Sequence, residues 1–74
     1  MKLELGDLVL VSHGTEAYME YTNAPFTIRI DTFVFLCKCE QDGWWVRYVG
    51  SLGKYTDAPG SPRRWVREID MIEV

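Results

Sequence analysis

Residues 26–49 read FTIRIDTFVFLCKCEQDGWWVRYV. The part from Phe26 to Cys39 is rich in β-branched and aromatic residues, which are typical of strands. Because this run is long for one flat strand, it predicts either a single strand bent near Asp31 or two strands with a tight break there. Residues 40–43 then predict a hairpin turn, since Asp-Gly supplies the positive φ that such turns require. A further strand is expected from Trp44 to Val49.

The tryptophan doublet lies at the start of this further strand. Successive side chains on a strand point to opposite faces, so Trp44 and Trp45 cannot both enter one core. Trp44 shares its face with Val46 and Tyr48, whereas Trp45 shares its face with Arg47. The pattern therefore favours Trp44 inside and Trp45 outside. A large ring held outside by a strand indicates a binding surface.

The N-terminal part predicts one strand and one loop. Residues 7–11 predict a first strand that is apolar on both faces, as in a strand enclosed by a barrel. In residues 15–25, Tyr18, Met19 and Tyr21 could form one helical turn or a short hairpin, but the segment is too short for a stable helix. We expect a long, partly ordered loop here, ended by a proline.

The C-terminal part predicts turns and short strands. Residues 50–53 indicate a second turn, residues 54–56 a brief strand, and residues 57–62 a loop. The serine-proline pair at the end of that loop could also start a helix, but residues 65–66 and 72–74 fit short strands around a turn at residues 68–70 better. The sequence thus predicts one all-β domain over residues 1–74, a small five-stranded antiparallel barrel with a long loop after the first strand.

Three pieces of the chain resemble SH3-like barrel modules. Residues 6–11 look like their opening strand, and residues 42–48, with DGWW followed by a basic residue, resemble their central strand. Residues 65–74 are similar to the closing strand, short turn and last strand of Tudor, chromo-barrel and KOW-type members. The resemblance implies an SH3-like barrel with a binding role.

The resemblance also implies candidate ligand-binding residues. Tudor and chromo-barrel domains bind methylated lysine in an aromatic cage, to which Trp45, Tyr48, Tyr55 and Trp65 could contribute. In peptide-binding SH3 domains the first tryptophan of the doublet lines the ligand groove, which argues for Trp44 outside. The aromatic opening strand of those domains and their proline-serine-asparagine-tyrosine run are absent from this sequence.

The charge distribution leaves two interpretations open. A net charge of −3 argues against a general nucleic-acid binder. Positive residues dominate residues 44–67, however, and negative residues dominate residues 16–42. The two halves could steer a partner's orientation, or they could attract each other within the fold or lie mixed over the surface.

The chain offers little for catalysis or metal binding. His13, the only histidine, lies beside Gly14 in a predicted turn, and no serine has a nucleophile-elbow pattern around it. Cys37 and Cys39 lack a second ligand pair, so we expect two reduced thiols on a strand, no metal and no cofactor. The sequence predicts no enzyme and no small-molecule substrate. Without a signal peptide or an apolar run that could span a membrane, a cytoplasmic protein is expected.

The remaining constellation is aromatic and basic. Aromatic faces stack on bases or cap cations, and arginine side chains bind phosphates or carboxylates. We therefore expect a non-catalytic protein-interaction module, an adaptor or inhibitor that docks on a larger partner, of a kind frequent in bacteria and their phages. The alternative is a nucleic-acid-binding barrel of KOW or Tudor type, which would need Arg47, Arg63, Arg64 and Arg67 on one face clear of acidic residues. The candidate partner-binding residues are Trp45, Arg47, Tyr55, Arg63, Arg64 and Trp65.

Overall fold

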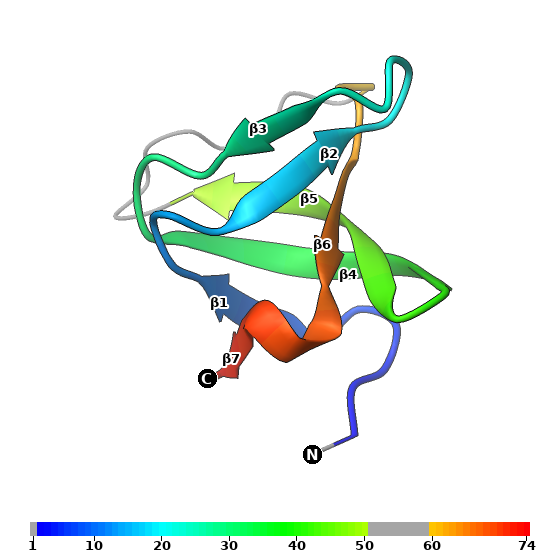
Figure 1. The fold of residues 1–74 in the computed structure, drawn as a ribbon. Coiled ribbons are helices and arrows are strands. Elements are labelled where there is room, and N and C mark those ends of the chain that lie inside the picture. The colour runs from blue at the N-terminus through cyan, green and yellow to red at the C-terminus, as the bar shows by residue number, and fades with distance from the viewer. Residues whose placement is uncertain (1, 51–59) are drawn as a thin grey trace.

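The computed structural model describes residues 2–50 and 60–74, whose strands form one antiparallel sheet (Figure 1). A three-residue 3-10 helix, η1, spans Glu68–Asp70, and the described residues contain no α-helix. The strands are β1 Leu8–Val11, β2 Glu16–Met19, β3 Pro25–Thr27, β4 Thr32–Glu40, β5 Gly43–Gly50, β6 Arg64–Arg67 and β7 Met71–Glu73. The predicted all-β antiparallel class is confirmed.

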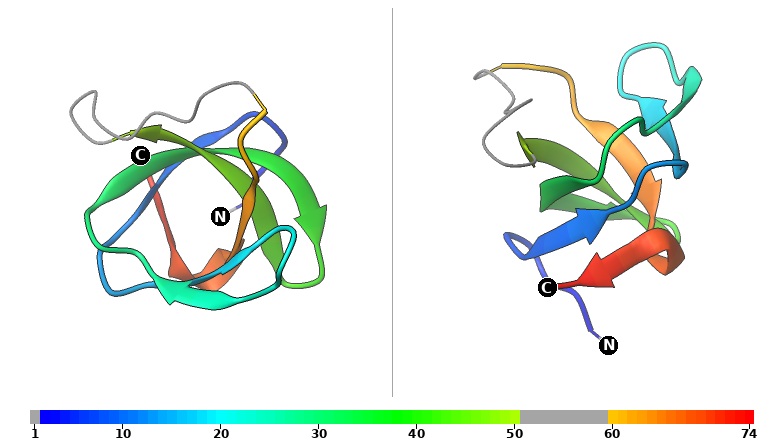
Figure 2. Two further views of the ribbon diagram at one scale, coloured as in Figure 1. Left: turned by 90° about the horizontal axis from the view of Figure 1, so that it is seen from above. Right: turned by 90° about the vertical axis from the view of Figure 1, so that its left-hand side faces the viewer.

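The sheet has the order β3-β2-β6-β5-β4-β1-β7, so β3 and β7 are its two ends and the sheet is not closed. It curls strongly, and the view from above shows its strands surrounding a common interior (Figure 2). The described residues form seven strands, where the sequence predicts five. The additional strands come from β2 and from the separation of β3 and β4.

The predicted long loop over residues 15–25 is wrong, because β2 and β3 form a hairpin there. Ala17 on β2 is buried opposite Phe26, and Asn23 takes the left-handed conformation of the turn with a φ of 56°. The partner of β2 on its other side is β6, which lies more than 40 residues later in the sequence. A strand stabilised by so distant a partner has little local signal, and this explains the wrong prediction.

The β-rich run from Phe26 to Cys39 is divided into β3 and β4, which confirms the alternative with two strands, but residues 28–31 separate them in place of the predicted tight break. Thr32 is buried at the start of β4, and its hydroxyl donates a hydrogen bond of 2.6 Å to the carbonyl of Ile30. The first half of β4 pairs with β1, and residues 33–40 pair with β5 with two irregularities. β4 therefore joins the two halves of the sheet.

The core lies on the inner face of the curled sheet. Trp44 is only 5% exposed and packs with buried Val46 and Val66, whereas Trp45 on the opposite face is half-buried. The predicted orientation of the doublet is thus confirmed. The indole Nε1 of Trp44 donates a hydrogen bond of 2.9 Å to the carboxylate of Glu68, so the polar atom of this buried ring is satisfied.

Two local predictions need correction. The predicted hairpin turn is present, but the residue with positive φ is Gln41, at 56°, and Gly43 is already in β5. On β1, Val9 and Val11 are buried while Leu8 is 40% exposed, so this strand is not enclosed on both faces. The closing strands β6 and β7 are found as predicted, separated by η1. The predicted turn and brief strand after Gly50 lie outside the described residues.

Candidate functional site

An aromatic row crosses three neighbouring strands on the outer face of the sheet. Tyr18 on β2 is directly opposite Trp65 on β6, and Trp65 is directly opposite Trp45 on β5. Residues paired in this way share one face of a sheet. The ring centroids of Tyr18 and Trp65 are 5.8 Å apart at an interplanar angle of 57°. The row consists of Tyr18, Trp65 and Trp45, all half-buried.

The position of Trp65 depends on Gly43, which starts β5. A side chain at residue 43 would overlap the Trp65 indole, so the ring lies against the bare backbone of the glycine. From there the indole Nε1 donates a hydrogen bond of 3.1 Å to the carbonyl of Glu40, on the other side of the β4–β5 turn. The turn and the aromatic row are therefore one packed unit.

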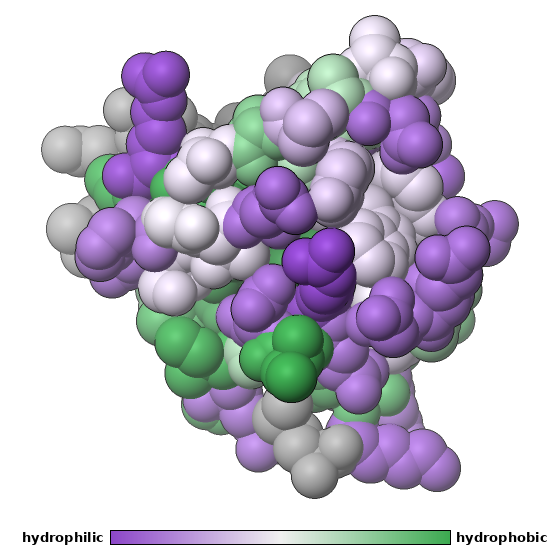
Figure 3. Space-filling model, viewed as in Figure 1, coloured by the Kyte–Doolittle hydropathy of each residue, from purple (hydrophilic) through white to green (hydrophobic). Residues whose placement is uncertain are grey.

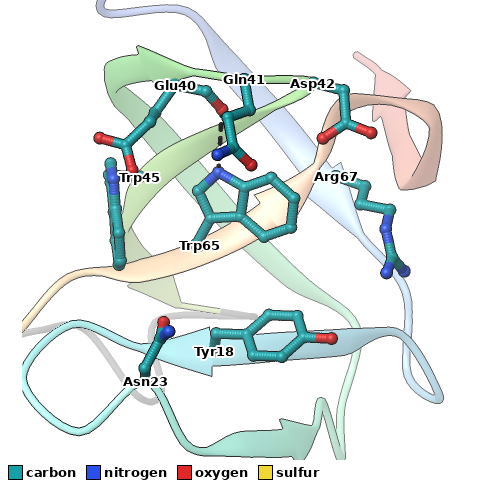
Figure 4. A pocket seen from close by; sticks show the side chains of 8 residues that line it. All are labelled: Tyr18, Asn23, Glu40, Gln41, Asp42, Trp45, Trp65 and Arg67. Carbon is teal, nitrogen blue, oxygen red and sulfur yellow. Dashed lines mark hydrogen bonds between the residues drawn. The ribbon is translucent and has the colours of Figure 1, made fainter.

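A hollow of about 390 Å³ opens over this row (Figure 4). Trp65 lies at its centre, with Trp45 and Tyr18 on two sides and the β4–β5 turn above (Figure 4). The turn contributes two carboxylates, those of Glu40 and Asp42. We call this site the aromatic hollow; its lining residues are Tyr18, Asn23, Glu40, Gln41, Asp42, Trp45, Trp65 and Arg67.

An ion pair between Arg63, just before β6, and Glu20, just after β2, flanks one end of the row. The Arg63 guanidinium donates to Glu20 Oε2 from Nε at 3.1 Å and from Nη2 at 2.6 Å. The backbone N–H of Arg63 also donates to Glu20 Oε1 at 2.9 Å. The side-chain hydrogen bonds are the largest cause that holds the pKa of the Glu20 carboxyl below its usual value, and the backbone bond adds to them. The side-chain bonds also raise the pKa of Arg63.

A second, more exposed ion pair flanks the row at the other end. Arg67 Nη1 lies 3.7 Å from Glu16 Oε1, and the same oxygen accepts a hydrogen bond of 2.7 Å from the Tyr18 hydroxyl. The bond to Glu16 raises the pKa of Tyr18, so this hydroxyl stays protonated as a donor at neutral pH. Residues 16, 18 and 20, on β2 and just after it, are an acid, an aromatic residue and an acid. They face residues 67, 65 and 63, on β6 and just before it, which are a base, an aromatic residue and a base.

The sequence left open whether the acidic and basic residues steer a partner or attract each other within the fold. At these positions they attract each other. The acidic Glu16 and Glu20 attract the basic Arg67 and Arg63 within the fold. Arg47 is engaged as well, because its Nη1 donates a hydrogen bond of 2.7 Å to the carbonyl of Ser61. These arginines are consequently not a free basic surface.

The predicted partner-binding residues are only partly brought together. Trp45 and Trp65 are neighbours, and the guanidinium carbon of Arg63 lies 5.8 Å from the centroid of the Trp45 ring. Arg47 is two residues from Trp45 on the same strand face. Arg64 instead lies opposite buried Val46, and its guanidinium carbon is 3.8 Å from the ring centroid of Tyr48, on the inner face. Tyr55 lies outside the described residues.

The sequence-based prediction missed several residues of the hollow, above all Tyr18 and the carboxylates of Glu40 and Asp42. A usable signal exists for Tyr18, because residues 16–20 alternate as Glu, Tyr and Glu at every second position. Residues 63–67 alternate as Arg, Trp and Arg. Comparing the two alternations would have made residues 16–20 a candidate strand, although neither segment by itself identifies the other as its partner.

Other reactive groups lie apart from the hollow's lining. The backbone N–H of His13 donates to Asp31 Oδ1 at 2.8 Å, and the His13 Nδ1 lies 2.9 Å from the same oxygen. These bonds lower the pKa of the exposed Asp31 carboxyl. Cys37 is half-buried at an irregularity of β4 and Cys39 is exposed, and neither forms a disulfide. Within residues 2–50 and 60–74, no three His, Cys, Asp or Glu residues gather in a way that could hold a metal ion.

No protein-family model, curated protein or solved structure matches the chain. Within the part of the chain that the structure describes, no helix has the length and apolar character to cross a membrane. What the aromatic hollow can do follows from its own chemistry. It presents three ring faces, the carboxylates of Glu40 and Asp42 and the guanidinium of Arg67, and the Glu40 carboxylate lies 3.8 Å from Lys38 Nζ. Ring faces and carboxylates attract cations.

Proposed function

We propose that this protein is a non-catalytic protein-interaction module that docks on a larger partner through the aromatic hollow. The observation that carries the proposal is the row of Tyr18, Trp65 and Trp45, held side by side on the outer face of three strands. Tryptophan and tyrosine rings held rigidly on strands contribute a large contact area at little cost in conformational entropy.

The hollow favours a partner that inserts a cationic side chain. Aromatic faces attract ammonium and guanidinium groups, and Arg63 of this same chain already lies against Trp45 in this way. The carboxylates of Glu40 and Asp42 line the same hollow and would add charge attraction, although the charge of Glu40 is partly balanced by Lys38, whose Nζ lies 3.8 Å from Glu40 Oε1. Arg67 also lines it, but its charge is partly balanced by Glu16.

A nucleic-acid ligand receives less support from these residues. Phosphate binding needs cations that face the ligand, whereas Arg63 and Arg67 are each paired with a glutamate and Arg64 stacks on the inner face. The carboxylates in the hollow would repel a phosphate backbone.

We also propose that the fold is related to SH3-like barrels. The succession of β6, the 3-10 helix η1 and β7 supports this relation, because it matches the closing strand, short turn and last strand of those modules. The antiparallel pairing of β7 with β1 brings the last strand beside the first and supports it further.

A binding assay on the hollow tests the cationic partner. We expect a peptide with one arginine to shift the indole N–H resonances of Trp45 and Trp65 in nuclear magnetic resonance spectra. The same peptide with citrulline, which lacks the charge, should shift them far less. The resonance of Trp44 is an internal control, because its indole is bonded to Glu68 in the core. Equal shifts with both peptides would contradict a cationic ligand.

Capture from a host lysate separates protein from nucleic-acid partners. The tagged protein should retain its partner after nuclease treatment, and Trp45→Ala should lose most of it. Tyr21→Ala is the matched control, since Tyr21 is an aromatic residue that is 78% exposed and does not line the hollow. Loss of the partner on nuclease treatment would instead indicate nucleic-acid binding, and equal capture by Trp45→Ala would exclude the hollow as the docking site.

A further inference from the structure

Three cationic side chains border Trp45, the ring at one end of the aromatic row. Lys38 is directly opposite Trp45 on β4, and Arg47 lies two residues along on the same face of β5. The guanidinium carbon of Arg63 lies 5.8 Å from the centroid of the Trp45 ring. A cation that binds the aromatic hollow approaches this same ring, because Trp45 lines the hollow. The charge around Trp45 therefore affects which ligand the hollow can take.

Two glutamates balance two of these cations, and they differ in how firmly they do so. Lys38 Nζ lies 3.8 Å from Glu40 Oε1, and both of these side chains are exposed. The half-buried Arg63 instead donates two hydrogen bonds to Glu20 Oε2, at 3.1 and 2.6 Å. Two charge-assisted bonds fix the orientation of a guanidinium. Glu20 thus holds the Arg63 side chain in place and balances its charge.

The Glu20–Arg63 pair lies beside the row and outside the hollow. Neither residue is among those that line the hollow. The hydrogen bonds from Arg63 are the main cause that lowers the pKa of the Glu20 carboxyl, and the charge of Arg47 lowers it further, so Glu20 lies within electrostatic range of both arginines. The view onto β2 and β6 is mostly hydrophilic, with green mainly toward its lower part (Figure 3). The pair can therefore change the electrostatic potential at the rings without touching a ligand.

We propose that Glu20 is a positioning residue that keeps the hollow available to a cation, because it holds and neutralises the chain's own cation at the Trp45 ring, Arg63. This inference rests on the proposed function. Arg63 already lies against the indole, and its charge would repel a second cation at the same ring. Paired with Glu20, it belongs to a unit without net charge, and the repulsion is cancelled.

The inference predicts opposite effects for the two members of the pair. Glu20→Gln leaves the Arg63 charge unbalanced and should weaken the binding of an arginine peptide by roughly three- to ten-fold, the effect near a protein surface of a unit charge about 10 Å away. Arg63→Gln leaves the Glu20 carboxylate unbalanced and should strengthen this binding. In the double variant Glu20→Gln/Arg63→Gln the pair is uncharged, so its affinity should lie near that of the wild-type protein.

Titration of these variants with the arginine peptide, followed through the indole N–H resonance of Trp65, tests the inference. Glu73→Gln is the matched control, because it removes one negative charge on the end strand β7 and should bind like the wild-type protein. Circular dichroism at the titration temperature checks that each variant is folded. The differences in affinity should shrink in roughly 1 M salt, where the Debye length is about 3 Å.

Arg63→Gln keeps the inference testable if Glu20→Gln does not fold, because charge predicts a gain in affinity and a structural role predicts a loss. Two results would overturn the inference and leave the proposed function in place. One is a similar loss of affinity in both single variants, which would make the pair a structural support. The other is a folded Glu20→Gln variant that binds as tightly as the wild-type protein. A wild-type protein that does not distinguish the arginine peptide from the citrulline peptide would contradict the proposed function, and this inference with it.

Discussion

The indole of Trp65 lies against the backbone of Gly43, in the space that any side chain at residue 43 would occupy. This contact explains why a glycine starts β5, although its φ is not positive. With the hydrogen bond from the indole Nε1 to the carbonyl of Glu40, it fixes the central ring of the aromatic row to the β4–β5 turn. The absence of a side chain at Gly43 thus leaves the space that the central ring of the candidate site occupies.

Replacing this glycine should destabilise the protein. In Gly43→Ala the new methyl group would meet the Trp65 ring and the carbonyl of Val66, so the strands must shift or the indole must leave its place. We expect the free energy of unfolding to fall by about 1–3 kcal/mol, the usual cost of overpacking. Chemical denaturation monitored by circular dichroism measures it.

A double-mutant cycle identifies the source of that cost. In a Trp65→Ala background, Gly43→Ala should cost clearly less, because only the overlap with the Val66 carbonyl remains. An unchanged cost in that background would show that the indole is not what requires a glycine at this position.

The two adjacent tryptophans should behave differently. Trp44→Ala empties a core site that is 5% exposed and leaves Glu68 without its hydrogen bond, so we expect a loss of about 3–5 kcal/mol of stability. Trp45→Ala removes a half-buried ring from the outer face and should cost clearly less while weakening partner binding. Thermal melts of the two variants, recorded side by side, make the comparison. A larger loss for Trp45→Ala would contradict the assignment of the faces.

Stability should depend on pH through the Glu20–Arg63 pair. The pKa of folded Glu20 lies below its usual value of 4.5, so its stabilising contribution is complete above pH 4.5 and is lost as the pH falls through the folded value. Glu20→Gln should therefore melt below the wild-type protein at pH 7. The difference in melting temperature should shrink as the pH falls through the folded pKa of Glu20, because the protonated carboxyl is then uncharged, like the glutamine.

Glu73→Gln is the matched control for this pH series, because Glu73 is an exposed carboxylate on the end strand β7, away from Arg63. Its melting temperature should follow that of the wild-type protein throughout. If the difference between Glu20→Gln and the wild-type protein stayed constant with pH, the ionised carboxylate would not be what stabilises the fold.

The two thiols should be reduced, metal-free and unequal in reactivity. Cys39 is exposed, whereas Cys37 is half-buried and its Sγ lies 3.7 Å from the carbonyl of Phe35. Alkylation of the native protein, followed by mass spectrometry of its peptides, should modify Cys39 several-fold faster. Stoichiometric zinc in elemental analysis, lost in Cys37→Ser or Cys39→Ser, would contradict the expectation of free thiols.

Much of the fold could be predicted from local sequence. The alternation of apolar and charged residues predicted Trp44 inside and Trp45 outside. The β-rich run predicted a strand at β4, and residues 40–43 predicted the hairpin turn. These features depend on neighbouring residues, through the two-residue period of a strand and the chemistry of turns. The closing strands around η1 were predictable for the same reason. Which residues of other strands they pair with could not be predicted from local sequence.

The tertiary structure alone decided β2 and the candidate site. Residues 16–19 become a strand because β6 pairs with them from far along the chain. Residues 63–67 place Trp65 and two arginines against Tyr18 and two glutamates of residues 16–20. The sequence determined that these arginines and acids exist, but only the fold pairs them and leaves the aromatic row between them. Arg64 has the same charge as its neighbour Arg63 and yet stacks on Tyr48, on the other face. Charge and composition fix what residues can do, while strand pairing over long sequence distances fixes which of them meet.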